Sequence, residues 1–188
     1  YSYYEQGANQ SATSGLMALK FYLISNLLWN CEQDGEALAE KFINQYYGPV
    51  ADYMLEYYNM IRIWYGHLQE EIDPPFRTNI YADICQAKYW PFDLVNNWKK
   101  NIFDKAYKSI EYLKTLDDES YTKYFNRIKK EELTLTYLFV SLHSDQFTSS
   151  ELTEMINDFE KYTTQFQFNY YIEGAYTKDL IENWRKSF

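Results

Sequence analysis

Apolar residues recur at helical spacing through almost the whole chain, and this feature restricts its fold more than any other. In residues 14–29, Leu19, Leu23 and Leu27 share one face, and further apolar residues cover the other faces. A helix that is apolar nearly all round usually lies at the centre of its fold. The same spacing predicts further helices over residues 34–48, 49–71, 91–116, 119–144, 148–166 and from 175 onward. We therefore predict an all-α fold, an antiparallel array of about six or seven helices.

Capping and helix-breaking residues mark the ends of these helices. Asp34 suits the N-cap of the second helix, because its carboxylate can accept hydrogen bonds from the free N–H groups of the first turn. Gly48 suits the left-handed position after a helix, and Pro49 suits the first turn of the next one. Thr148 and Glu151 have the spacing of a capping box. These residues predict short connections between neighbouring helices.

Three segments do not follow the helical pattern clearly. Residues 75–90 follow a proline pair and are predicted as a long loop, or as a loop with one short helix. Apolar residues alternate over 166–172, which suits a short strand as well as the end of a helix. Residues 1–4 resemble the end of a strand, and a strand needs neighbours that this chain does not supply. We therefore predict a strand-like lead-in over residues 1–13, continuing from a preceding barrel, and a helical domain over 14–188.

The composition excludes several classes of partner and site. The net charge is −9, with 18 Lys and Arg against 27 Asp and Glu, so nucleic acid is not an expected partner. No apolar run reaches the ~18 residues of a transmembrane segment. Cys31 and Cys85 lack the spacing of a metal or redox pair. A disulfide between them stays open, but two unpaired and largely buried thiols are the favoured interpretation.

No catalytic or metal-binding motif is visible in the sequence. It lacks a Gly-rich phosphate loop, a Gly-x-Ser-x-Gly elbow and a His-Glu-x-x-His pair, and His67 and His143 lie far apart. A glycosidase needs two carboxylates ~5–10 Å apart across the sugar. Acidic pairs such as Glu131-Glu132 do not suit that role, because adjacent carboxylates on a helix point in different directions, and we expect them to be solvated. We therefore predict no catalytic residues, no metal site and no cofactor, and do not expect the chain to be an enzyme by itself.

Aromatic residues are unusually frequent, with 21 Tyr, 12 Phe and 5 Trp, or 20% of the chain. Most of them occupy helical spacings that predict burial, since large aromatic side chains dominate ordinary cores. Those near expected loops or the start of the chain are candidates for stacking on a sugar: Tyr3, Tyr4, Tyr46, Tyr47, Tyr89 and Trp90.

Three motifs occur together in the first third of the chain. They are Tyr4-Glu5-Gln6-Gly7, Leu27-Leu28-Trp29-Asn30 and Tyr46-Tyr47-Gly48-Pro49. In this order they resemble domain-of-unknown-function family 4838, a set of secreted bacterial proteins related to glycoside hydrolases. In that family a Glu-Gln-Gly-like turn leaves the last part of a (β/α) barrel, and helices with these endings follow. The segment 133–142 and Glu173-Gly174 resemble the end of the family's pattern.

The resemblance implies a function for the chain. It implies the C-terminal helical accessory domain of a glycoside-hydrolase-like, carbohydrate-active protein, bracing the barrel and contributing to its sugar cleft. The implied partners are the preceding barrel and a glycan, and the implied location is secreted, periplasmic or at the cell surface. Candidate sugar-binding residues are Tyr4, Glu5 and Gln6 at the barrel turn, and Trp29 and Asn30 at the end of the first helix.

Two alternatives stay open at this point. The chain could be a stand-alone helical module that binds a glycan or a protein. The candidate residues could also be purely architectural, with Glu5 and Gln6 satisfying backbone groups at the turn and Trp29 lying in the core.

Overall fold

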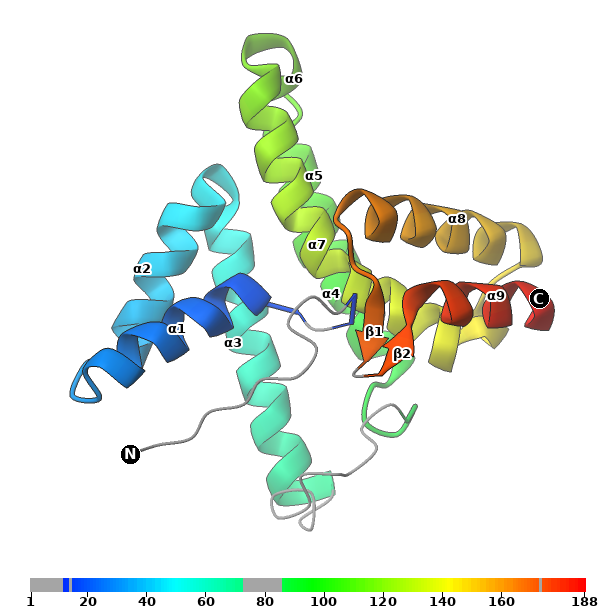
Figure 1. The fold of residues 1–188 in the computed structure, drawn as a ribbon, viewed down its shortest axis with the longest axis horizontal. Coiled ribbons are helices and arrows are strands. Elements are labelled where there is room, and N and C mark those ends of the chain that lie inside the picture. The colour runs from blue at the N-terminus through cyan, green and yellow to red at the C-terminus, as the bar shows by residue number, and fades with distance from the viewer. Residues whose placement is uncertain (1–11, 14, 73–85, 173) are drawn as a thin grey trace. The chain divides into compact units, whose positions relative to one another are not determined.

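The computed structural model describes residues 12–13, 15–72, 86–172 and 174–188. Each predicted helix is present in these residues, which confirms the all-α fold (Figure 1). The elements are α1 (Met17–Trp29), α2 (Gly35–Tyr47), η1 (Gly48–Val50), α3 (Ala51–His67), η2 (Leu68–Ile72), α4 (Phe92–Trp98), η4 (Lys99–Phe103), α5 (Asp104–Ile110), α6 (Leu113–Leu116), α7 (Asp118–Leu142), η5 (Ser144–Gln146), α8 (Ser149–Gln165), β1 (Tyr170–Ile172), β2 (Ala175–Tyr176) and α9 (Thr177–Ser187). The predicted lead-in over 1–13 lies outside the described residues except for its last two.

The chain divides into two compact units, each with its own buried apolar residues. One unit consists of residues 18–128. The other consists of the described residues between 12 and 17 together with residues 129–188, and we call it the 129–188 unit. The boundary falls after Ile128, so α7 supplies residues to both units.

In the 18–128 unit, α2 packs against α3 and the chain reverses at Gly48 (Figure 1). Asp34 caps α2 as predicted, because its carboxylate accepts hydrogen bonds from Glu36 N at 2.9 Å and Ala37 N at 3.2 Å. Gly48 has a φ of +52°, as predicted for the residue that ends this helix. A Cβ atom at Gly48 would lie 2.6 Å from the hydroxyl oxygen of Tyr124, so this position also requires the absence of a side chain.

A π segment interrupts the long helix predicted over residues 91–116. The π turn of η4 holds one residue more than an α-helical turn. This extra residue shifts the buried face of the helix by ~100° around the axis, the rotation of one residue. Ile102 and its neighbour Phe103 are therefore both buried, although the spacing predicts only Ile102 in the core. The ring of Tyr57 on α3 contacts Phe103 at 4.9 Å and Trp98 at 5.7 Å between centroids. These aromatic contacts join α3 to the end of α4 and to the π segment itself.

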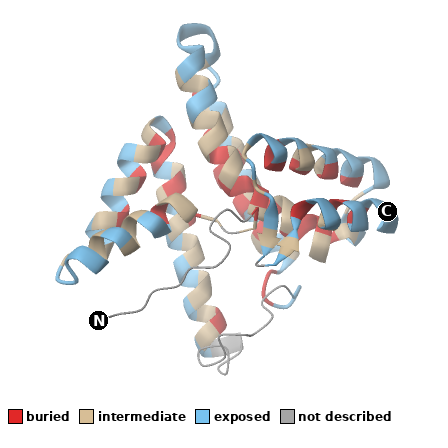
Figure 2. Cartoon of the chain, in the orientation of Figure 1, coloured by how far each residue is buried: buried red, intermediate tan, exposed pale blue. Residues whose placement is uncertain are grey.

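In the 129–188 unit, α8 packs against α9, and the buried residues of the two helices lie on their facing sides (Figure 2). The predicted capping box opens α8: Thr148 N donates to the Glu151 carboxylate at 2.8 Å, and Glu151 N donates to the Thr148 hydroxyl at 3.3 Å. Trp184 on α9 contacts Phe159 on α8, with 5.1 Å between ring centroids. The facing apolar sides of α8 and α9 thus contribute to the core of this unit, together with buried residues of α7 such as Leu135 and Leu138.

The alternating segment after α8 ends in a short antiparallel hairpin. Tyr170 of β1 pairs with Tyr176 of β2, so the strand interpretation holds from Tyr170 onward. Tyr170 and Ile172 are exposed, whereas Tyr171 between them contacts Tyr137 at 6.1 Å between ring centroids. The alternating apolar residues therefore face solvent at this hairpin.

Candidate functional site

The predicted barrel-turn residues Tyr4, Glu5 and Gln6 lie outside the described residues, so their role stays a prediction. Residues 12, 13, 15 and 16, just before α1, are described, and backbone contacts of Ala12 and Leu16 hold this segment to the 129–188 unit. Ala12 N donates to the carbonyl of Tyr170 at 3.0 Å. Leu16 has a φ of +56°, and its N–H donates to the buried Glu131 carboxylate. These hydrogen bonds hold Ala12 and Leu16 to the 129–188 unit.

The other predicted candidates, Trp29 and Asn30, lie at the surface. Trp29 ends α1 and its side chain is 93% exposed, so the alternative that places Trp29 in the core is wrong. The side chain of Asn30 is engaged locally, because its Oδ1 accepts a hydrogen bond from Glu32 N at 3.0 Å. Asn30 therefore stabilises the turn that leads to α2.

The apolar residues of α1 remain largely at the surface. Of the 13 residues of this helix, all of which the structure describes, only Leu19 is buried. The expectation that this helix lies at the centre of the fold is therefore wrong. Phe21, Leu28 and Trp29 are exposed, and we call these three residues the α1 surface. Phe21 and Leu28 are seven residues apart and share one helix face, with Trp29 one position further round.

Most aromatic residues predicted near loops are buried. Tyr47, Tyr89 and Trp90 belong to the core of the 18–128 unit, and Tyr46 is half-buried. Trp90 contacts Trp98 with 6.3 Å between ring centroids. The prediction that Tyr47, Tyr89 and Trp90 are exposed is therefore wrong, because proximity to a turn does not keep a large ring out of the core.

The prediction that the Glu131-Glu132 pair is solvated is also wrong. The two residues are 5% and 4% exposed. They point in different directions, as predicted: Glu131 accepts from the backbone before α1, and the Glu132 carboxylate lies 2.7 Å from Lys129 Nζ. Lys129 Nζ also lies 2.8 Å from the Asp158 carboxylate on α8. These contacts engage the carboxylates of Glu131, Glu132 and Asp158 within the fold and make them structural.

The ammonium of Lys129 is the positive centre of this network. Burial alone lowers the pKa of Lys129, but the charges and hydrogen bonds of Glu132 and Asp158 outweigh burial, so its pKa is raised. Lys129 therefore stays charged at neutral pH.

No metal or membrane-spanning feature is found in the part of the chain that the structure describes. No group of three or more His, Cys, Asp or Glu residues there could hold a metal ion, and no helix is long and apolar enough to cross a membrane. Cys31 is exposed and free, so the prediction of a buried thiol is wrong for Cys31. Cys85 lies outside the described residues.

A cleft of about 540 Å³ lies in the 129–188 unit, where α8 ends and α9 begins. This volume lies within the ~300–1,000 Å³ range of ligand sites. α8 closes with a Schellman motif: Phe168 N donates to the Thr163 carbonyl at 2.8 Å, and Gln167 N donates to the Thr164 carbonyl at 3.1 Å. Gln167 has a φ of +59° and occupies the position that glycine usually takes in this motif.

Thr177, the first residue of α9, joins the two walls of the cleft. Thr177 N donates to the Asn169 carbonyl at 2.9 Å, and the Thr177 hydroxyl donates to the Phe168 carbonyl at 2.8 Å. These two bonds hold the turn after α8 against the start of α9. Exposed side chains of Thr164, Gln167 and Asn169 line the cleft above this fixed backbone.

The charges in the lining are few and partly neutralised. The Glu160 carboxylate accepts two hydrogen bonds from the Arg185 guanidinium, at 2.6 and 3.2 Å. Lys178 is the other charged residue of the described lining. The cleft therefore lacks the clustered cations of a phosphate site and the clustered carboxylates of a metal site.

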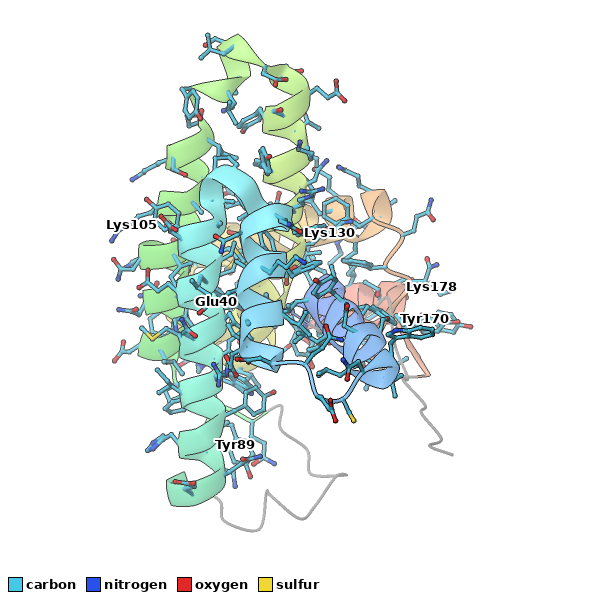
Figure 3. All side chains as sticks on the ribbon, turned by 90° about the vertical axis from the view of Figure 1, so that its left-hand side faces the viewer. Glu40, Tyr89, Lys105, Lys130, Tyr170 and Lys178 are labelled. Carbon is cyan, nitrogen blue, oxygen red and sulfur yellow. The ribbon has the colours of Figure 1, made fainter. Side chains whose placement is uncertain are left out.

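An exposed pair of tyrosine rings borders the cleft. Tyr176 lines it and stacks on Tyr170 of the paired strand, with 4.9 Å between centroids and 28° between planes. The side-chain hydrogen bond with Tyr176 raises the pKa of Tyr170. Lys178 Nζ lies 5.5 Å from the Tyr176 ring, and Figure 3 shows Tyr170 and Lys178 close together. The hairpin thus places an aromatic face beside the amide and hydroxyl groups of the lining.

None of the cleft residues was a candidate from the sequence. The one sequence feature that marks this region is the alternation of apolar residues over 166–172, which indicates a strand but not a binding site. The cleft forms because the Schellman motif and the hairpin turn the chain twice within a few residues. Gly174 lies in the second turn, but Gln167 takes the place of glycine in the first.

Two of the three comparisons with known proteins found nothing. No curated protein and no solved structure matches the chain significantly. The family comparison matched the part of the chain that holds all three sequence motifs. Residues 1–59 match the family described as Domain of unknown function (DUF4838), which confirms the predicted family resemblance for this part of the chain.

Proposed function

We propose that this chain is the C-terminal helical accessory domain of a glycoside-hydrolase-like, carbohydrate-active protein, and that α1 braces a preceding (β/α) barrel. The α1 surface supports this proposal. Leu28 is 58% exposed and Trp29 is 93% exposed on the helix that directly follows the predicted barrel turn. A helix whose apolar residues stay exposed is expected to bury them against another surface, here that of the barrel.

The size of the α1 surface suits a bracing contact. Full burial of a large apolar side chain contributes about 1.5–3 kcal/mol of binding free energy. Burial of Leu28 and Trp29 together therefore contributes several-fold more free energy than a surface hydrogen bond. The contact would also fix the direction in which the helical chain leaves the barrel, since α1 begins at Met17, shortly after the predicted barrel turn.

The bracing contact predicts that polar substitution on α1 weakens association with the barrel. The polypeptide encoded upstream of Tyr1 is produced separately and titrated with this chain by calorimetry. We expect Leu28→Ser with Trp29→Ser to weaken the association by at least tenfold, because the α1 surface then gains little from burial. Ile63→Ser is the matched control, since Ile63 is 70% exposed on α3 outside the α1 surface, and it should leave the affinity unchanged.

Two results would contradict the bracing role. Equal affinity of the Leu28→Ser/Trp29→Ser variant and the unaltered chain would show that α1 does not form the contact. A gene product without a (β/α) barrel before Tyr1 would remove the proposed partner altogether.

The barrel turn is the second place to test. The loops after the strands of a (β/α) barrel form its active-site face, so Glu5 and Gln6 are proposed to hydrogen-bond sugar hydroxyls there, with Tyr4 as a stacking ring. In the full-length protein, Glu5→Gln and Gln6→Ala should each weaken glycan binding or turnover while the melting temperature stays nearly unchanged. A lower melting temperature with unchanged glycan affinity would instead make this turn architectural.

A further inference from the structure

We propose that the cleft between α8 and α9 binds a neutral oligosaccharide. The proposal concerns residues 160–181 of the 129–188 unit alone, and it does not depend on the contact between α1 and a barrel.

The amide groups of the lining match the hydrogen-bonding character of a sugar. Gln167 and Asn169 each present a carbonyl acceptor and an NH₂ donor, and a sugar hydroxyl is likewise both donor and acceptor. Both side chains are exposed and line the cleft, and neither has a hydrogen-bond partner among the described residues. The Thr164 hydroxyl lies in the same lining and adds a third group of this type.

The aromatic border supplies the apolar contact that a sugar ring needs. One face of a pyranose consists mostly of C–H groups and packs against an aromatic ring. Tyr176 reaches the cleft with its ring held in place by the stack on Tyr170. The stack covers one face of each ring, so a sugar can pack against Tyr176 only on the face turned away from Tyr170.

The charges of the cleft disfavour anionic ligands. Glu160 is already bound by Arg185, so this pair offers little net charge to a ligand. Asp179 lies in the first turn of α9 and complements the positive end of the helix dipole, where an anion would otherwise be attracted. Lys178 alone does not make the convergent set of cations that phosphate recognition uses.

The backbone conformation of Gln167 also supports ligand binding at this cleft. A non-glycine residue with positive φ is strained, and glycine at the same position of a Schellman motif would relieve the strain. Strained residues that persist beside a cleft are common where the side chain contributes to binding. Gln167 fits this pattern because its side chain lines the cleft.

The test measures binding of neutral oligosaccharides to the 188-residue chain by calorimetry and by saturation-transfer NMR. The probes are α- and β-1,4-linked glucose oligomers, β-1,4-linked xylose oligomers and N-acetylglucosamine oligomers, each at millimolar concentrations. We expect at least one of them to bind, and Gln167→Gly and Tyr176→Ala to weaken that binding about tenfold each. Gln167→Gly keeps the turn and should leave the melting temperature equal or higher, so its loss of binding cannot be due to unfolding.

Control variants separate the outcomes. Tyr112→Ala removes an exposed tyrosine of the 18–128 unit and should leave binding unchanged.

Lys178→Met should change the affinity less than twofold, and a loss as large as that of Gln167→Gly would indicate an anionic ligand and overturn the proposal. No binding of any probe, or binding that Gln167→Gly and Tyr176→Ala both retain, would also overturn it. A short peptide that binds and competes at the cleft in place of every sugar would show that the ligand class is wrong.

Discussion

Replacing Lys129 with methionine should lower the free energy of unfolding by about 3–5 kcal/mol. The cost arises because the buried carboxylate of Glu132, which is 4% exposed, would lose the ammonium that lies 2.7 Å from it. Asp158 is less affected, since its side chain is 44% exposed and water can solvate it. Urea unfolding of the unaltered chain and of Lys129→Met, followed by circular dichroism at neutral pH, measures the difference.

A matched lysine and a double variant isolate the buried charge. Lys161 Nζ lies 4.7 Å from the Tyr162 ring and Lys129 Nζ lies 4.8 Å from it, but Lys161 is exposed. Lys161→Met should therefore cost only about 0.5–1 kcal/mol. Lys129→Met combined with Glu132→Leu should recover most of the loss, because it removes the buried carboxylate together with the ammonium, and the remaining Asp158 is 44% exposed. A cost for Lys129→Met no larger than that of Lys161→Met would show that the network contributes little.

The contribution of Lys129 also depends on pH in a defined direction. The pKa of Lys129 is raised in the folded state, so its stabilising effect is fully present below the unfolded pKa of about 10.4. The effect is lost as the pH rises through the folded pKa. The difference in stability between the unaltered chain and Lys129→Met should therefore be constant between neutral pH and about pH 9, and should shrink at higher pH.

Replacing Gly48 with alanine should destabilise the protein by about 2–4 kcal/mol. Two effects add: the φ of +52° strains any residue with a Cβ atom, and this atom would lie 2.6 to 2.8 Å from atoms of the Tyr124 side chain. Thermal and urea unfolding measure the loss. Gly66→Ala is the matched control, because Gly66 lies within α3 with nothing within 4 Å of its Cβ position, and alanine should stabilise that helix by about 0.5–1 kcal/mol.

A double variant separates the two effects at Gly48. Gly48→Ala with Tyr124→Ala removes the steric contact but keeps the backbone strain. The two substitutions together should then cost about 1–2 kcal/mol less than the sum of the single ones. Strict additivity would show that the Tyr124 ring moves away without cost, and an unchanged stability of Gly48→Ala would contradict the requirement for glycine.

The sequence alone determined the helices and most of their ends. The Asp34 cap, the capping box of Thr148 and Glu151, and the reversal at Gly48 all formed where the residues predict them. Each depends on hydrogen bonds or sterics between residues a few positions apart, so the local sequence holds the necessary information. The apolar spacing determined the all-α fold for the same reason, since a helix brings residues three and four apart onto one face.

The tertiary structure alone decided which of those faces are buried. Glu131 and Glu132 were expected in solvent and are buried. The backbone before α1 satisfies Glu131 across a long separation in the sequence, and Lys129 joins its neighbour Glu132 to the distant Asp158 on α8. Trp29 shows the opposite case, since this apolar end of α1 is 93% exposed in the part of the chain that the structure describes. The cleft beside Gln167 likewise arises only where α8, the hairpin and α9 meet. Burial and cleft formation depend on contacts between distant elements, and the periodicity of a single segment does not contain them.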